Sequence, residues 1–313
     1  MVSFAGAPPL AQEQDAFHPA YAARFEEFTA AGQRAGFAPA QSDDEKIALV
    51  LVDYQHDFVD PTGTLAVPGA QNDVARLLSW FYTNAHRITT IYASLDTHLP
   101  FQIFFSAWWQ SPSTGEHPQP FTAISAEDID HSRWVPMRES AWSTRYVHLL
   151  GEQARKDLMI WPHHTMQGTQ GHMLVAPLSE AIAWHSAARD TSPVYLTKGL
   201  TPRTEFYGIF GAEVPDPRDP AGNLNIPLLD AVLQHDRIYI AGEAKSHCVL
   251  ETVRQLAGYC RDQPELLQRL HFLTDCTSSV EHPAIDFDAL AEEELALMQQ
   301  QGVQMVRSAE PLR

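Results

Sequence analysis

Short apolar runs alternate along the chain with segments of helical periodicity. The runs cover residues 47–53, 88–96, 193–198, 237–242, 270–275 and 303–306, and the first of them, IALVLVD, is apolar on both faces. Helical patterns lie between the runs, at residues 72–81, 176–184, 228–234, 249–259 and 288–301. Strands that alternate with helices form parallel sheets covered on both faces. The pattern therefore predicts a Rossmann-like three-layer α/β fold around a six-stranded, mostly parallel sheet.

Two segments stand outside this alternation. Residues 1–44 precede the first strand and are predicted to form an N-terminal arm with a short helix, leaving residues 45–313 for the domain. Residues 100–160 are too long for an ordinary crossover, so we expect an insertion near the active edge of the sheet. Its aromatic residues could cap a pocket, but a subunit interface is favoured, because an exposed apolar cluster needs a partner. These residues are Phe101, Phe104, Phe105, Trp108 and Trp109. The N-terminal arm is likewise interpreted as part of a subunit interface. The two segments together predict a homo-oligomer.

Composition excludes several classes of protein. The chain has 21 Lys and Arg against 39 Asp and Glu, a formal net charge of −18. So negative a surface repels phosphate, which argues against nucleic-acid binding and against an anionic membrane surface. Nothing approaches the run of about 20 apolar residues that a membrane-spanning helix needs. The N-terminus also lacks the basic region followed by an apolar stretch that marks a secretory signal. The three cysteines show no disulfide framework. We therefore expect a cytoplasmic protein.

The ends of the predicted strands carry the candidate chemistry. Ligands of open parallel sheets bind beyond the carboxyl ends of the strands. Those positions hold Asp53, Asp96 with His98, Lys198, and the segment 241–248 that ends in Cys248. Each alone has an ordinary explanation, as a cap, a solvated cation or a small buried hydrophobe. Together they could form an activated thiol, because a carboxylate can take its proton while an ammonium stabilises the charge.

The same residues lie in motifs that resemble a known family. DYQHDF at 53–58 and GTLAVPG at 63–69 are similar to the opening D-x-Q-N-D-F and G-x-L-x-V-x-G of nicotinamidases, which are isochorismatase-like cysteine hydrolases. DTH at 96–98, WPHH at 161–164, KG at 198–199 and AGEAKSHCV at 241–249 resemble the D-x-H, W-P-x-H, K-G and nucleophile-turn motifs. Order and approximate spacing hold from about residue 45 to residue 308. The resemblance implies an isochorismatase-like fold of the nicotinamidase-like branch.

The resemblance also implies catalytic roles. Cys248 would be the nucleophile, Asp53 the general base and Lys198 the residue that orients Asp53. The backbone N–H groups of Ala244 and Cys248 would form the oxyanion hole, and the peptide bond before Ala244 would be cis. The implied reaction is attack on an amide carbonyl, loss of ammonia, and hydrolysis of the thioester by water.

A metal site is implied by Asp96, His98 and His164, which match the family's ligands and would hold Zn²⁺, or alternatively Fe²⁺ or Mn²⁺. Asp96 and His98 share one face of a strand end, whereas only the fold can bring in the third ligand. His163 could replace its neighbour, or the two histidines could line a polar pocket without metal. Gln102 stands where some nicotinamidases have a further histidine.

The substrate pocket would have an aromatic wall made by Phe58, Trp161, and Phe206 or Tyr207, although such residues are also common in ordinary cores. The leading hypothesis for the function is release of ammonia from a small carboxamide, with nicotinamide as the leading candidate substrate. An alternative is an N-carbamoyl, ureido or maleamate-type amide, with the metal absent or dispensable. A catalytically silent binding module of the same fold is a third hypothesis, because a fold alone does not prove activity.

Overall fold

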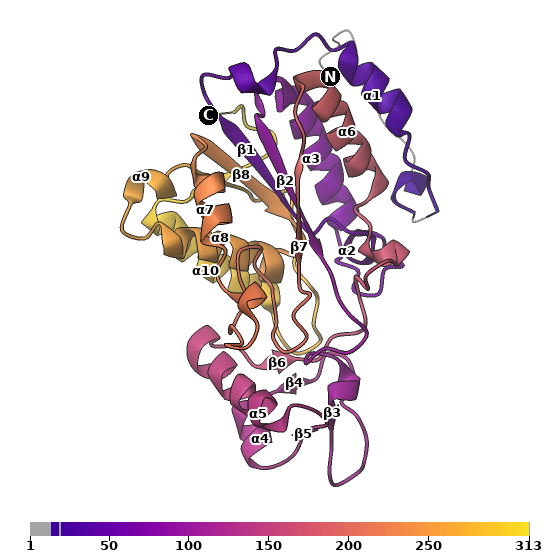
Figure 1. Ribbon diagram of the computed structural model, residues 1–313, viewed down its shortest axis with the longest axis vertical. Helices are drawn as coiled ribbons and strands as arrows, with labels where there is room; N and C mark the ends of the chain where they lie inside the picture. The colour runs from indigo at the N-terminus through magenta and orange to yellow at the C-terminus, as the bar shows by residue number, and fades with distance from the viewer. Residues whose placement is uncertain (1–13, 19, 313) are drawn as a thin grey trace.

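The predicted runs form one parallel sheet in the computed structural model, which describes residues 14–18 and 20–312 (Figure 1). The strand order is β10-β9-β8-β1-β2-β7, and every neighbouring pair is parallel. The strands are β1 (Ile47–Val52), β2 (Thr90–Asp96), β7 (Val194–Lys198), β8 (Arg237–Gly242), β9 (Leu270–Leu273) and β10 (Gln304–Val306). The α/β fold is thus confirmed, with a sheet that is parallel throughout.

Helices cover the two faces of this sheet (Figure 1). On one face lie α3 (Ala70–Asn84) and α6 (Ala176–Arg189), with α1 (Phe25–Gln33) of the arm packed on α6. On the other lie α7 (Ile226–Leu233), α8 (Leu250–Tyr259) and α10 (Phe287–Gln301). Two short helices, α2 (His56–Val59) and α9 (Pro264–Leu267), follow β1 and precede β9. Strand β1 is buried at every position, because neighbours and helices surround it completely.

The first residues of the arm, 1–13, lie outside the described part of the chain. From α1 onward it packs closely on the domain. Gly32 permits this approach, since a Cβ atom there would lie 2.3 Å from the Trp184 carbonyl oxygen. Arg189 of α6 forms a buried ion pair with Asp43. No helix in the part of the chain that the structure describes is long and apolar enough to cross a membrane.

Residues 100–160 form a small lobe beyond the carboxyl end of the sheet (Figure 1). Two antiparallel strand pairs build it, β3 (Trp109–Gln110) with β5 (Val135–Pro136) and β4 (Ala123–Ile124) with β6 (Leu158–Met159). Helices α4 (Ala126–Asp130) and α5 (Ser140–Leu149) complete it.

The expectation that the lobe exposes an aromatic cluster is wrong. Phe104, Phe105, Trp108 and Trp109 are each at most 3% exposed, and Phe101 stacks on Trp108. The chain covers these rings itself, so they do not call for a subunit partner.

Candidate active site

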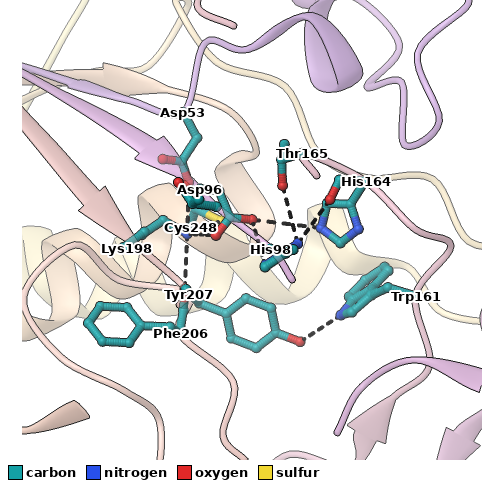
Figure 2. A network of polar contacts seen from close by, with 12 residues as sticks. Asp53, Asp96, His98, Trp161, His164, Thr165, Lys198, Phe206, Tyr207 and Cys248 are labelled. Atoms are coloured by element: carbon teal, nitrogen blue, oxygen red, sulfur yellow. Dashed lines mark hydrogen bonds and ion pairs between the residues drawn. The ribbon is translucent and has the colours of Figure 1, made fainter. Parts of the chain in front are cut away.

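The parallel register brings the candidate residues together at one edge of the sheet (Figure 2). Asp96 and Lys198 end β2 and β7 and are paired in register. Asp53 follows β1, and Cys248 lies in the turn between β8 and α8. Because neighbouring parallel strands end at the same edge, side chains distant in sequence meet there.

Lys198 is the centre of this arrangement. Its Nζ lies 2.9 Å from Asp53 Oδ2, 2.9 Å from Asp96 Oδ1 and 3.6 Å from Cys248 Sγ, and it donates a hydrogen bond to the Phe206 carbonyl oxygen at 2.9 Å. The side chain is only 2% exposed. One buried ammonium therefore links the candidate base, the candidate nucleophile and the candidate metal site.

Burial and charge set the protonation states of this group. Burial lowers the pKa of Lys198, but Asp53 and Asp96 raise it by more, so the net shift is well upward and the lysine stays charged. Burial raises the pKa of Asp53 despite the nearby ammonium. Burial also raises the pKa of the Cys248 thiol well above its ordinary value, with Lys198 opposing the shift. The thiol is thus protonated at neutral pH, and Asp53 beside it is a stronger base than an exposed aspartate.

Asp53 is held in an uncommon backbone conformation. Its φ is 49°, in the left-handed region, which costs about 1–3 kcal/mol for a residue other than glycine. Ser94 Oγ donates to Asp53 Oδ1 at 2.6 Å and accepts the Asp53 backbone N–H at 3.1 Å. Ser94 is not among the site residues expected from the sequence. The available signal was its position two residues before Asp96 in a strand, which places both side chains on one face.

The turn that carries Cys248 begins with close backbone packing. Gly242 is required there, because a Cβ atom would lie 2.2 Å from the Val52 carbonyl oxygen. The peptide bond between Glu243 and Ala244 is cis, as the resemblance implied. A π-helical turn, Lys245–Val249, then leads into α8. Ala244 and Cys248 both line the cavity in which a substrate would react.

Asp96, His98 and His164 form a buried group with one ligand atom from each within 4.8 Å of the others. Nε2 of His98 lies 3.2 Å from Asp96 Oδ2, and Nε2 of His164 lies 3.7 Å from it. The Nδ1 atoms contact backbone carbonyl oxygens instead, His164 O for His98 and Pro162 O for His164. Burial lowers the pKa of His164 to about 3, which keeps its imidazole neutral. Two imidazole Nε2 atoms and a carboxylate suit a divalent transition-metal ion.

The two doubtful positions have other roles. The His163 ring is stacked on Phe105 with centroids 4.2 Å apart, so His164 and not His163 joins the group. Gln102 is fully buried, accepts the Leu99 N–H at 2.8 Å and donates to the Gly199 carbonyl oxygen at 2.7 Å. Gln102 therefore supports the loop after β2 and is not a member of the metal-ligating group.

Residues of the opening motif position the candidate metal group, Asp96, His98 and His164, through its backbone. Gln55 accepts the Asp96 N–H at 2.7 Å and donates to the Asp96 carbonyl oxygen at 2.8 Å. Asp57 Oδ2 accepts the N–H of Thr165 at 2.7 Å, directly after His164. These two side chains fix both segments that carry the ligands.

A cavity opens beside Cys248 and the metal group. Phe58, Trp161, Phe206 and Tyr207 all line it, so the structure gathers every residue expected for the aromatic wall. Its volume is about 30 Å³, against the ~150 Å³ of a cavity that admits benzene. An aromatic substrate therefore enters only if the lining side chains move.

Two further polar residues border this cavity. Trp161 Nε1 donates to Glu205 Oε1 at 3.1 Å, and burial raises the pKa of Glu205 well above its ordinary value. His247 lies with its ring centroid 5.3 Å from that of Trp161, and burial lowers its pKa to about 3. Sequence reasoning assigned neither residue to the pocket. His247 could have been found beside Cys248, whereas nothing in the sequence marks Glu205.

Comparison with known proteins agrees with this fold. No protein-family model matches the chain, and no curated protein sequence does. Among solved structures, it is similar to an Acinetobacter baumanii nicotinamidase/pyrazinamidase, with 20% identity, 85% of this chain and 98% of that chain covered, and a TM-score of 0.53. The yeast nicotinamidase bound to the inhibitor nicotinaldehyde has 17% identity, 83% and 99% coverage and a TM-score of 0.53. An L. infantum protein in complex with nicotinate has 18% identity, 85% and 95% coverage and a TM-score of 0.51. The chain thus has the isochorismatase-like α/β fold, in the form that nicotinamidases have.

Proposed function

We propose that the chain is a cysteine amidohydrolase that cleaves the C–N bond of a small carboxamide and releases ammonia. Nicotinamide is its leading candidate substrate. The observation that carries the proposal is the contact of the Lys198 ammonium with Asp53, Asp96 and Cys248. The likeness in fold to nicotinamidases supports it.

In the proposed reaction, Asp53 takes the thiol proton as Cys248 Sγ attacks the amide carbonyl carbon. Backbone N–H groups of Ala244 and Cys248 donate to the developing oxyanion. Asp53 then returns the proton to the nitrogen, ammonia leaves, and a thioester remains. Asp53 next takes a proton from water, which attacks the thioester and releases the carboxylic acid and the thiol. Lys198 holds Asp53 in position and offsets negative charge through both steps.

The donor set of Asp96, His98 and His164 fits a divalent ion, which we propose to be Zn²⁺, or alternatively Fe²⁺ or Mn²⁺. When bound, such an ion would supply a Lewis acid beside the pocket. Gln55 and the backbone carbonyls at the Nδ1 atoms would keep the ligands oriented.

The pocket favours a neutral amide over the maleamate or N-carbamoyl amino acid alternative. Those substrates carry a carboxylate in addition to the bond that is cleaved, and a buried carboxylate needs a cation. Among the described residues that line the pocket, none is lysine or arginine, and Glu205 adds a carboxyl group. Lys198 is already shared by two carboxylates.

The cytoplasmic location and the homo-oligomeric state expected from the sequence stay predictions.

Ammonia release from nicotinamide tests the proposal, using protein supplied in turn with Zn²⁺, Fe²⁺ or Mn²⁺. C248A should abolish release. C260A is the matched control, because Cys260 is also buried but lies just beyond the far end of α8. Full turnover by C248A would refute the cysteine mechanism. Turnover of ureido or carbamoyl compounds, with none of nicotinamide, would establish the alternative substrate class.

A further inference from the structure

A second, larger cleft adjoins the reacting pocket. It has a volume of about 830 Å³, within the range of about 300–1,000 Å³ typical of small-molecule sites. Met159 at the end of the insertion, Leu250 of α8 and Leu290 of α10 contribute apolar lining. These elements meet where the insertion lobe approaches the helices of the C-terminal half (Figure 1).

Two side chains separate this cleft from the pocket. Tyr207 and His247 line both spaces, and their ring centroids are 5.4 Å apart. On the pocket side His247 packs against Trp161, and on the cleft side against Phe287, with centroids 4.7 Å apart. Because the pocket itself is too small for a ring, movement of these side chains would admit a substrate and join the two spaces.

The cleft contains a buried carboxylate with an unused oxygen. The Glu213 side chain is 3% exposed, and its Oε1 has no hydrogen-bond partner in the described structure. Its Oε2 lies 2.7 Å from Lys156 Nζ, but the same ammonium also pairs with Glu251. Burial and the charge of Glu251 raise the pKa of Glu213. An additional cation would relieve this excess of negative charge.

Of the three cations among the described residues that line the cleft, Lys156 and Arg254 are already paired, and Arg155 is exposed. Lys156 serves two carboxylates and lies 4.9 Å from the centre of the Tyr207 ring. Arg254 pairs with Glu251 and with Glu294. A carboxylate ligand at Lys156 or Arg254 would have to compete with these pairs, whereas Glu213 Oε1 has no hydrogen-bond partner to give up when a basic nitrogen group binds. The net charge of −18 also attracts cations.

We propose that this cleft binds the distal part of the acyl group of an extended amide substrate, and that this part carries a basic nitrogen group that contacts Glu213. The inference rests on the proposed function. The reaction stays the hydrolysis of R–CO–NH₂ with water to R–COOH and ammonia, with the amide at Cys248 and the far end of R in the cleft.

Three matched amides test the inference. Each is a pyridine-3-carboxamide with the same flexible chain on the ring, ending in an amine, a hydroxyl or a carboxylate. We expect kcat/KM for the amine to exceed that for the hydroxyl on the order of tenfold, because a charge-assisted hydrogen bond to a buried group is involved. E213Q should remove most of this ratio. E294Q is the matched control, since Glu294 also lines the cleft but is 46% exposed and pairs with Arg254, and it should keep the ratio.

A second variant acts without disturbing the buried network. Leu290 is 52% exposed and lines the cleft, so L290K should lower kcat/KM for the amine-ended amide and raise it for the carboxylate-ended one. Equal kcat/KM for the amine and hydroxyl compounds in the wild-type protein would overturn the inference, as would an E213Q variant that keeps their ratio. If no amide is hydrolysed, the proposed function fails by itself. Calorimetric binding of the three amides to C248A then tests the cleft separately. Tighter binding of the amine-ended amide would support the inference, and equal binding of the three would overturn it.

Discussion

Replacing Lys198 by methionine removes the ammonium that contacts both Asp53 and Asp96. The two contacts, each of 2.9 Å, join groups that are at most 5% exposed. At an effective dielectric constant of about 20, each contributes on the order of 5 kcal/mol before desolvation. Desolvation of the ammonium offsets several kcal/mol of this sum. Because the variant leaves two carboxylates without their common cation, we expect its free energy of unfolding to fall by about 3–5 kcal/mol at pH 7.

Guanidinium-induced unfolding measures this loss, and ammonia release measures the accompanying loss of activity. The double variant D53N/K198M provides the control, because it removes one carboxylate together with the ammonium. It should be more stable than K198M while staying inactive. A loss below about 1 kcal/mol in K198M, or a double variant less stable than the single one, would refute a buried ion pair at the centre of the site.

Three other outcomes follow from the structure. His185 is buried, and its pKa is lowered to about 4. Between pH 7 and pH 5 the unfolded chain therefore binds a proton at this histidine that the folded chain does not bind, and the free energy of unfolding should fall by about 2 kcal/mol. H185Q should flatten this pH dependence in unfolding titrations. Gln102 uses its buried amide to bind backbone groups, so Q102H should lose about 1–3 kcal/mol of stability and bind no more metal than the wild type in elemental analysis. Metal removal by a chelator should lower both activity and Tm, because ligands stabilise the folded state that binds them; H164A should reduce bound metal while H163A, whose ring stacks on Phe105, should not.

Hydrophobic patterning predicted the sheet because its inner strands β1, β2, β8 and β9 are almost entirely buried. A run such as Ile47–Val52 has no alternation to misinterpret, and each run became a strand. The insertion could not be predicted in this way. Its strands are two residues long, too short for any periodicity. Its aromatic residues were assigned to the surface because composition does not report which rings cover one another.

The site divides along the same line. Strand ends and the nicotinamidase-like motifs indicated Asp53, Asp96, Lys198 and Cys248, since parallel strands of one sheet must end together. The sequence could not choose between His163 and His164, because adjacent residues in a loop can point either way. The structure decides this through the backbone, where Asp57 binds the N–H of Thr165.

The insertion contributes to the site from within and not as a separate cap. The rings of Phe104 and Phe105 lie 4.8 and 5.8 Å from that of His98, so the aromatic cluster packs against the metal group. The chain then leaves the lobe through Lys156 and Met159, which line the second cleft, and reaches Trp161, which lines the pocket. Both walls that a substrate would meet therefore include residues of this one segment or the turn that follows it. Under the proposed function, selection among amides is expected to reside there, because Asp53, Lys198 and Cys248 at the sheet edge would contact only the bond that reacts.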